Sequence, residues 1–319
     1  LMSFPDKLSQ AKGMFWATVL SNQQIRTCYN RIIIELGADA VPFFHSVIPG
    51  QFVMLDLTQT ALPAQEKIPD ALKDTVKRQL ILRRPFSFSD VSVGQGENGP
   101  VVKLEIMYCV LGPSTVRMTS LSKGDKINVL GPLGNGFNIL PDKELSILIA
   151  GGMGAPPLLH LALALKKLST KVLVFAGARS CDDLPFTIRI GNITGLVLEE
   201  FWQLGVDCQI ATDDGSAGFK GYVTACAENW LSKNTWNPAR TAIYACGPEI
   251  MLAAAAQLAL KHDVPCQVSM ERMMACGIGL CQSCAIEHKT TQPQQTEYKL
   301  CCKEGPVFDA RDVVFSKEG

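Results

Sequence analysis

The chain has 319 residues, of which 47% are hydrophobic and 19% charged, a composition that fits two or three packed domains and excludes long disorder. The 30 basic residues balance 30 acidic ones, so the net charge of zero gives no electrostatic case for binding nucleic acid or an acidic membrane surface. The 12 cysteines, together with an N-terminal stretch that lacks an apolar signal core, predict a reducing, cytoplasmic location.

Residues 1–140 are predicted to form an antiparallel β-barrel domain. Short β-branched or apolar runs alternate there with glycine, proline and asparagine, as in small barrels. Residues 58–80 are polar and contain proline, so we expect an insertion between two strands. The expected strands cover residues 14–20, 29–36, 51–57, 101–110 and 126–130.

Residues 141–263 are predicted to form a doubly wound parallel sheet, because strand-like and helix-like segments alternate there. Residues 264–319 lack that alternation and are rich in cysteine, so we treat them as a small third segment. The expected strands of the sheet cover 146–150, 171–176, 207–212 and 242–245, and the expected helices cover 158–168 and 250–261.

Residues 145–165 carry no charge and are long enough to span a membrane. Glycines at 151, 152 and 154 and prolines at 156 and 157 would interrupt a helix where its backbone most needs internal hydrogen bonds. A strand, a glycine turn and a helix are therefore expected, with no membrane span.

Three cysteines of the third segment follow the spacing Cys276-x4-Cys281-x2-Cys284, which is typical of a plant-type [2Fe–2S] cluster. A loop that supplies three thiolates must coil around the cluster. Gly277 and Gly279 permit the positive φ angles that this needs.

Cys302 is the predicted fourth ligand, and its neighbour Cys301 is the reserve. A structural zinc ion is the alternative, since it also takes four cysteines. Zinc sites usually show two pairs of closely spaced cysteines rather than three cysteines in nine residues, so the spacing favours iron and sulfur.

Gly151-Gly152-Met153-Gly154-Ala155-Pro156 forms a glycine-rich turn between a strand and a helix. Such a turn lets a pyrophosphate approach backbone N–H groups, although this one departs from G-x-G-x-x-G and could be only a tight turn.

Arg179 follows the next strand, where a Rossmann site reads the adenosine ribose. It could favour a 2′-phosphate or be a solvated surface charge, so NADH and NADPH both stay open. Cys246-Gly247-Pro248 ends another strand, and its last two residues could simply start a helix.

Arg84-Pro85-Phe86-Ser87 opens a strand after the insertion. An arginine beside a hydroxyl could bind diphosphate, and Phe86 could pack on a flavin ring. The alternative is an exposed arginine and a core phenylalanine.

In their order along the chain, these motifs resemble the ferredoxin reductase superfamily, whose flavin motif is R-x-[YF]-[ST]. More narrowly, the chain resembles the electron-transfer subunits of class 1B dihydroorotate dehydrogenase. The matching stretches span nearly the whole chain and are PGQFVML (49–55), LRRPFSFS (82–89), GPLGNGF (131–137), ATDDGSAGFKGYV (211–223), CGIGLCQSC (276–284) and CKEGPVF (302–308).

The resemblance implies an FAD-binding β-barrel, an NAD(P)-binding domain and a C-terminal [2Fe–2S] segment. Three departures stand out: Ser114 replaces a usual glycine, the insertion at 58–80 is long, and Cys301–Cys302 is a doublet. The implied FAD residues are Arg84, Pro85, Phe86, Ser87, Met107, Tyr108, Cys109, Ser114 and Thr115; the implied NAD(P) residues are Gly152, Gly154, Pro156, Cys246, Gly247 and Pro248; the implied cluster ligands are Cys276, Cys281, Cys284 and Cys302.

The resemblance also implies a function. Hydride from NAD(P)H would reach the flavin and single electrons would leave through the cluster, with no catalytic side chain needed. The implied partner is the FMN-containing dihydroorotate dehydrogenase catalytic subunit, in a heterotetramer of pyrimidine biosynthesis, and the net flow would then run towards NAD⁺. Two alternatives stay open: a reductase subunit for another partner (ferredoxin, hydrogenase or sulfide dehydrogenase), and a zinc-stapled nucleotide-binding regulatory module.

Overall fold

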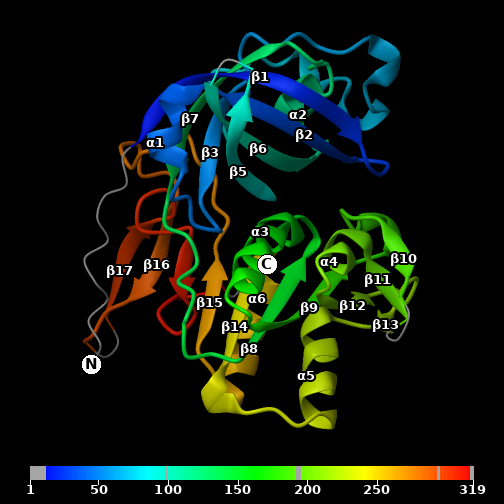
Figure 1. The fold of residues 1–319 in the computed structure, drawn as a ribbon, viewed down its shortest axis with the longest axis vertical. Coiled ribbons are helices and arrows are strands. Elements are labelled where there is room, and N and C mark those ends of the chain that lie inside the picture. The colour runs from blue at the N-terminus through cyan, green and yellow to red at the C-terminus, as the bar shows by residue number, and fades with distance from the viewer. Residues whose placement is uncertain (1–11, 98, 192–194, 293–294, 317–319) are drawn as a thin grey trace.

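The computed structural model describes residues 12–97, 99–191, 195–292 and 295–316. Its N-terminal part is a curled antiparallel sheet of seven strands in the order β4-β3-β7-β1-β2-β6-β5 (Figure 1). Strands β4 and β5 are the two edges, so the sheet is a half-barrel, and all five strands predicted for this part are present. The strands are β1 (Gly13–Gln24), β2 (Tyr29–Leu36), β3 (Phe52–Asp56), β4 (Arg84–Ser87), β5 (Asp90–Gly96), β6 (Gly99–Cys109) and β7 (Lys126–Leu133).

The half-barrel curls around a core built by alternation along its strands. On β2, Ile32, Ile34 and Leu36 are fully buried, while the residues between them are half-buried. The short helix α1 (Val41–Phe44) adds Phe44 to the same core, and α2 (Pro113–Met118) adds Met118.

The predicted insertion is a chain of three short 3₁₀ helices, η2 (Gln65–Lys67), η3 (Asp70–Leu72) and η4 (Thr75–Lys77). It is tied to the barrel through α2. Val76 packs against Val116, and the guanidinium of Arg117 donates to the carbonyl of Val76 at 3.1 Å.

The second part is a parallel sheet in the order β13-β12-β9-β8-β14-β15, closed by the antiparallel edge strand β18. Strand β8 is flanked by β9 and β14, so the strand order reverses beside it, as in a doubly wound fold. The elements are β8 (Leu145–Gly151), α3 (Ala155–Lys167), β9 (Lys171–Ala178), α4 (Glu199–Gln203), β12 (Asp207–Thr212), β13 (Phe219–Lys220), α5 (Val223–Lys233), β14 (Thr241–Cys246), α6 (Glu249–Lys261), β15 (Cys266–Ser269) and β18 (Val307–Asp309).

Helices cover both faces of this sheet. Leu148 and Val174 point into a core with α3 and α4, whereas Ile147 and Phe175 point into a core with α5 and α6. Strands β10 (Ile188–Ile190) and β11 (Leu196–Leu198) form a small separate pair. No helix in the described part of the chain is both long and apolar enough to span a membrane.

The cysteine-rich segment is joined to the parallel sheet more closely than its composition indicates. The expected boundary falls between residues 263 and 264, yet β15 lies just past it and pairs with β14, and β18 returns to pair with β15. Both strands are too short to show a periodic pattern. Between them the segment forms the hairpin of β16 (Ala285–Lys289) and β17 (Thr296–Leu300), drawn in orange to red in Figure 1.

Candidate cofactor and cluster site

The glycine turn after β8 and the Cys246-Gly247-Pro248 turn after β14 meet at the reversal point of the sheet. A Cβ at Gly154 would overlap the carbonyl oxygen of Cys246, so the two turns touch backbone to backbone. The space beside Gly152 is open, with no heavy atom within 4 Å of a Cβ placed there. Such open space would let a dinucleotide approach the chain at this edge of the sheet, as expected for this turn.

The remaining residues expected at the NAD(P) site support these turns. Pro156 is buried within the first turn of α3, and Pro248 directly precedes α6. Burial raises the pKa of the Cys246 thiol to about 12, so this side chain stays protonated at neutral pH.

Arg179 lies just past β9, at the expected position for reading the ribose, but it is not free. Its guanidinium faces the carboxylate of Asp183, with Nε–Oδ2 at 3.4 Å and Nη2–Oδ1 at 3.5 Å. The hydroxyl of Ser180 donates to the same carboxylate at 3.1 Å. The Arg179 guanidinium is therefore paired with a carboxylate, which would compete with a 2′-phosphate for it.

The loop that begins at Asp213, for which the sequence predicts no function, fixes the chain around Arg179. The N–H groups of Asp213 and Asp214 donate to the carbonyls of Ala178 and Arg179, each at 3.1 Å. The sequence DDGS is typical of a turn, and it could have predicted this loop. The Asp214 carboxylate accepts a hydrogen bond from the N–H of Ser216 at 2.9 Å.

The expected flavin strand β4 is a half-buried edge of the barrel. The Arg84 guanidinium donates to the carbonyls of Leu82 and Arg83, and it forms no ion pair among the described residues. A guanidinium without a carboxylate, next to the half-buried Phe86 and Ser87, fits a cofactor that carries both a diphosphate and an aromatic ring.

The expected FAD residues of β6 point in alternate directions. Tyr108 is buried in the barrel core, where its hydroxyl donates to Asn22 at 3.0 Å, so only its main chain is available to a ligand. Met107 and Cys109 face the other side, and the Cys109 thiol lies 3.4 Å from that of Cys28. Burial raises the pKa of Cys109 to about 12.

Ser114 and Thr115 lie in the first turn of α2. Ser114 is buried. The Thr115 hydroxyl accepts hydrogen bonds from the N–H groups of Leu111 (2.9 Å) and Gly112 (3.2 Å), so it shapes the turn that enters the helix.

The cysteine loop coils as its glycines predict, with φ of 72° at Gly277 and 89° at Gly279. The N–H groups of Ile278 and Cys281 point at the Cys276 sulfur, at 3.4 and 3.5 Å. Such donors stabilise a thiolate and tune a bound cluster.

Cys281 is the exposed member of the loop. Hydrogen bonds with Ser283, and then hydrogen bonds with Cys276, lower the pKa of the Cys281 thiol to about 6. A thiol that is already ionised near neutral pH is prepared to bind metal.

The two adjacent cysteines, Cys301 and Cys302, have different neighbouring groups. Burial, and then the neighbouring thiols of Cys284 and Cys276, raise the pKa of Cys302 to about 12, so Cys302 faces the loop. Burial and Cys284 raise the pKa of Cys301 to about 12 as well, but its other charged neighbour groups are Arg272 and Glu249. Both thiols interact with Cys284, and Cys302 also interacts with Cys276, which is consistent with its predicted role as the fourth ligand.

Across residues 12–97, 99–191, 195–292 and 295–316, no three His, Cys, Asp or Glu side chains converge as ligands of one metal ion would. A two-iron cluster divides four thiolates between its irons, so it does not require three of them around one point.

The cysteine loop is seated directly on the flavin half-barrel. A Cβ at Gly277 would stand 2.6 Å from Cγ and 2.9 Å from Sδ of Met54 on β3. Met54 in turn pairs with Pro85 of the flavin strand β4. The expected cluster and flavin residues are thus separated by one strand of the barrel, a proximity that the spacing of motifs along the sequence does not reveal.

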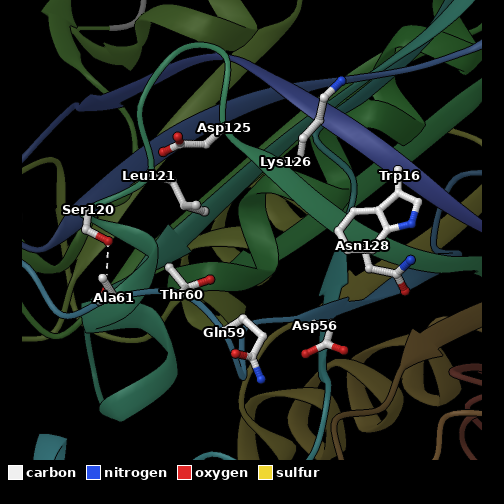
Figure 2. A pocket seen from close by; sticks show the side chains of 10 residues that line it. All are labelled: Trp16, Asp56, Gln59, Thr60, Ala61, Ser120, Leu121, Asp125, Lys126 and Asn128. Carbon is white, nitrogen blue, oxygen red and sulfur yellow. Dashed lines mark hydrogen bonds between the residues drawn. The ribbon is translucent and has the colours of Figure 1, made fainter.

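A cavity of about 370 Å³ lies elsewhere on the barrel and contains none of the expected site residues (Figure 2). It is bordered by Trp16 of β1, by the chain just after β3, and by the chain just after α2. At its edge Arg83 bridges Asp56 (3.5 Å) and Asn128 (2.6 Å), so the first arginine of the Arg83-Arg84 pair serves to join strands.

Comparisons with known proteins agree with this arrangement. Residues 271–314 match the model of the iron-sulfur cluster binding domain of dihydroorotate dehydrogenase B. The dihydroorotate dehydrogenase B (NAD(+)) electron transfer subunit of Desulforamulus reducens is 34% identical over 87% of this chain and 90% of its own length. The chain belongs to this family of electron transfer subunits. The subunit of Caldanaerobacter subterraneus is likewise 34% identical, over 84% of this chain and 87% of its own.

Solved structures place the family fold among the ferredoxin reductases. A chain of the NADH-dependent reduced ferredoxin-NADP oxidoreductase, studied for flavin-based electron bifurcation, superposes with a TM-score of 0.68 at 25% identity. The match covers 94% of this chain and 90% of that one. A ferredoxin NADP+ reductase from Neisseria gonorrhoeae, at 15% identity and a TM-score of 0.53, shares the fold over 78% of this chain and 91% of its own.

Proposed function

We propose that this chain is the electron transfer subunit of a dihydroorotate dehydrogenase of the B type. It connects NAD(P)(H) with the catalytic subunit of that enzyme through FAD and an iron–sulfur cluster, as part of pyrimidine biosynthesis. When bound, FAD converts the two-electron chemistry of nicotinamide into the one-electron steps that a cluster accepts. The observation that carries the proposal is the family match over most of the chain, cluster domain included.

The chain's own residues supply binding and placement. Arg84 and Ser87 would hold the FAD diphosphate, and the Gly152–Gly154 turn would receive the dinucleotide beside Cys246. The four thiolates would come from Cys276, Cys281, Cys284 and Cys302. The seat of Gly277 on Met54 supports this assignment, because it brings the cysteine loop next to the flavin strand.

The partner in this proposal is the FMN-containing catalytic subunit, in a heterotetramer. A cytoplasmic location belongs to the proposal too, since thiolates that bind a cluster need a reducing compartment.

Anaerobic purification tests the proposal. The protein should be yellow-brown, contain flavin, iron and acid-labile sulfide, and be bleached by NADH. Co-expression with a dihydroorotate dehydrogenase catalytic subunit should yield a stable complex that reduces NAD⁺ with dihydroorotate. Iron-free protein that cannot be reconstituted would contradict it.

A second candidate is a reductase subunit with ferredoxin as its partner, favoured by the superposition on the ferredoxin-NADP oxidoreductase chain. It predicts NADH-dependent ferredoxin reduction and no complex with a dihydroorotate dehydrogenase. The zinc-stapled module has lost its support, because the matching domain is an iron-sulfur one.

A further inference from the structure

One amide side chain of the barrel holds the turn that follows Cys302. The Asn135 Nδ2 group donates to the carbonyl oxygens of Lys303 at 3.1 Å and Glu304 at 2.9 Å. The main-chain N–H of Asn135 donates to the next carbonyl, that of Gly305, at 2.6 Å. Three consecutive carbonyls directly after the expected fourth ligand are therefore bound by a single residue from another part of the chain.

The loop that carries Asn135 is itself fixed to the barrel. The buried side chain of Gln51, directly before β3, donates to the carbonyl of Gly134 at 2.7 Å. Its oxygen accepts the N–H of Ile48 at 2.9 Å. Asn135 thus extends from a support that continues into β3, the strand on which the cysteine loop also rests.

The turn after β17 is held together by hydrogen bonds between its own residues. The N–H groups of Lys303, Glu304 and Gly305 all donate to the carbonyl of Leu300, at 3.0, 2.9 and 3.3 Å. The Glu304 carboxylate accepts the N–H of Leu300 at 2.8 Å. Whatever fixes the carbonyls of this turn also fixes the position of Cys302 within it.

We propose that Asn135 is a positioning residue that fixes the Cys302 thiol relative to the flavin strand. It binds no cofactor in this role; its two amide donors hold the 300–305 turn on the half-barrel. The inference rests on the proposed function, since it concerns the placement of the cluster ligand that function requires.

Two substitutions separate hydrogen bonding from packing. Asn135→Ala removes both donors. Asn135→Asp keeps the shape but sets a carboxylate against two carbonyl oxygens, so it should be the more damaging change. Asn138→Ala is the matched control in the same loop, because the contacts described for Asn138 are made by its main chain, with Gln267 and Tyr244.

Hydrogen exchange of the holoprotein is the first measurement. Asn135→Ala should exchange the amides of the 300–305 turn about tenfold faster, because the net contribution of the two hydrogen bonds is lost there, and Asn135→Asp should exchange them faster still. The second measurement is the reduced-cluster signal in electron paramagnetic resonance, which should change in shape while iron content is kept. In stopped flow, NADH should still reduce the flavin at the wild-type rate, and cluster reduction should be slower.

Wild-type exchange in the turn together with a wild-type cluster signal in Asn135→Asp would overturn the inference. So would faster exchange that spreads across β1–β7, since it would mean general destabilisation. These outcomes can be distinguished from failure of the proposed function. A wild-type chain unable to bind iron would contradict that function. Hydrogen exchange in the 300–305 turn would still report whether Asn135 holds the turn.

Discussion

Gly154 lies with its Cα against the main-chain carbonyl of Cys246, which locks the turn after β8 to the turn after β14. Gly154→Ala must separate the two turns, and we expect NADH-dependent flavin reduction to fall at least about tenfold, since small displacements at a binding site are costly. Reduction by dithionite should be unaffected. Gly94→Ala is the control, because no atom lies within 4 Å of a Cβ at that position. Wild-type NADH kinetics in Gly154→Ala would contradict the assignment of this site.

The two cysteines of the doublet should respond differently to substitution. Cys302→Ser should lose iron and keep flavin, because its thiol faces Cys276 and Cys284. Cys301→Ser should keep iron and lose about 1 kcal/mol of unfolding free energy, as for a modest change in a core. Iron assay and urea unfolding measure both effects. The opposite pattern of iron loss would make Cys301 the ligand.

The pairing of Arg179 with Asp183 predicts a preference for NADH over NADPH. Asp183→Asn frees the guanidinium for a 2′-phosphate and should raise kcat/KM for NADPH about fivefold, which corresponds to an exposed ion pair of about 1 kcal/mol. Asp182→Asn is the control, since Asp182 pairs with Arg26 instead. If Asp183→Asn leaves the NADPH kinetics unchanged, Arg179 does not lie at the ribose.

His160 predicts a loss of stability in mild acid. Burial on α3, and then the charge of Lys167, lower its pKa to about 4. The unfolded chain, with an ordinary histidine pKa near 6.5, binds the proton more readily, so stability present above about pH 6.5 is lost as the pH falls towards 4. From pH 7 to pH 5 the loss should be about 2 kcal/mol in urea unfolding.

His160→Leu should flatten that pH dependence, because the apolar side chain takes no proton. The exposed His45→Leu serves as the matched control and should keep the wild-type slope. A His160→Leu slope equal to that of the wild type would assign the acid sensitivity to other groups.

The main elements of the fold were predictable because their patterns are long. The alternation along 29–36 and the apolar run at 146–150 coincide with β2 and β8, and the helix expected at 250–261 coincides with α6. Strands such as β13, with two residues, and β15, with four, carry no periodic signal and exist through pairing with β12 and β14.

The candidate site was predictable as a set of motifs and not as an arrangement. The spacing of the cysteine loop gives its ligands, but the seat of Gly277 on Met54 joins positions more than two hundred residues apart. Asn135 and the turn after Cys302 are likewise joined although they lie 168 residues apart. Such contacts follow from how the domains pack, which no local pattern encodes.

The return of β18 to β15 has a consequence for dissecting the protein. Strands β15 and β18 of the cysteine-rich segment both belong to the sheet of the preceding domain, so the segment is not a separate module. A chain shortened after Asp263 would leave β14 as an exposed, apolar edge strand with unpaired backbone N–H and C=O groups. Such an edge promotes aggregation. Nucleotide binding and cluster assembly should therefore be gained and lost together when the polypeptide folds or is cut.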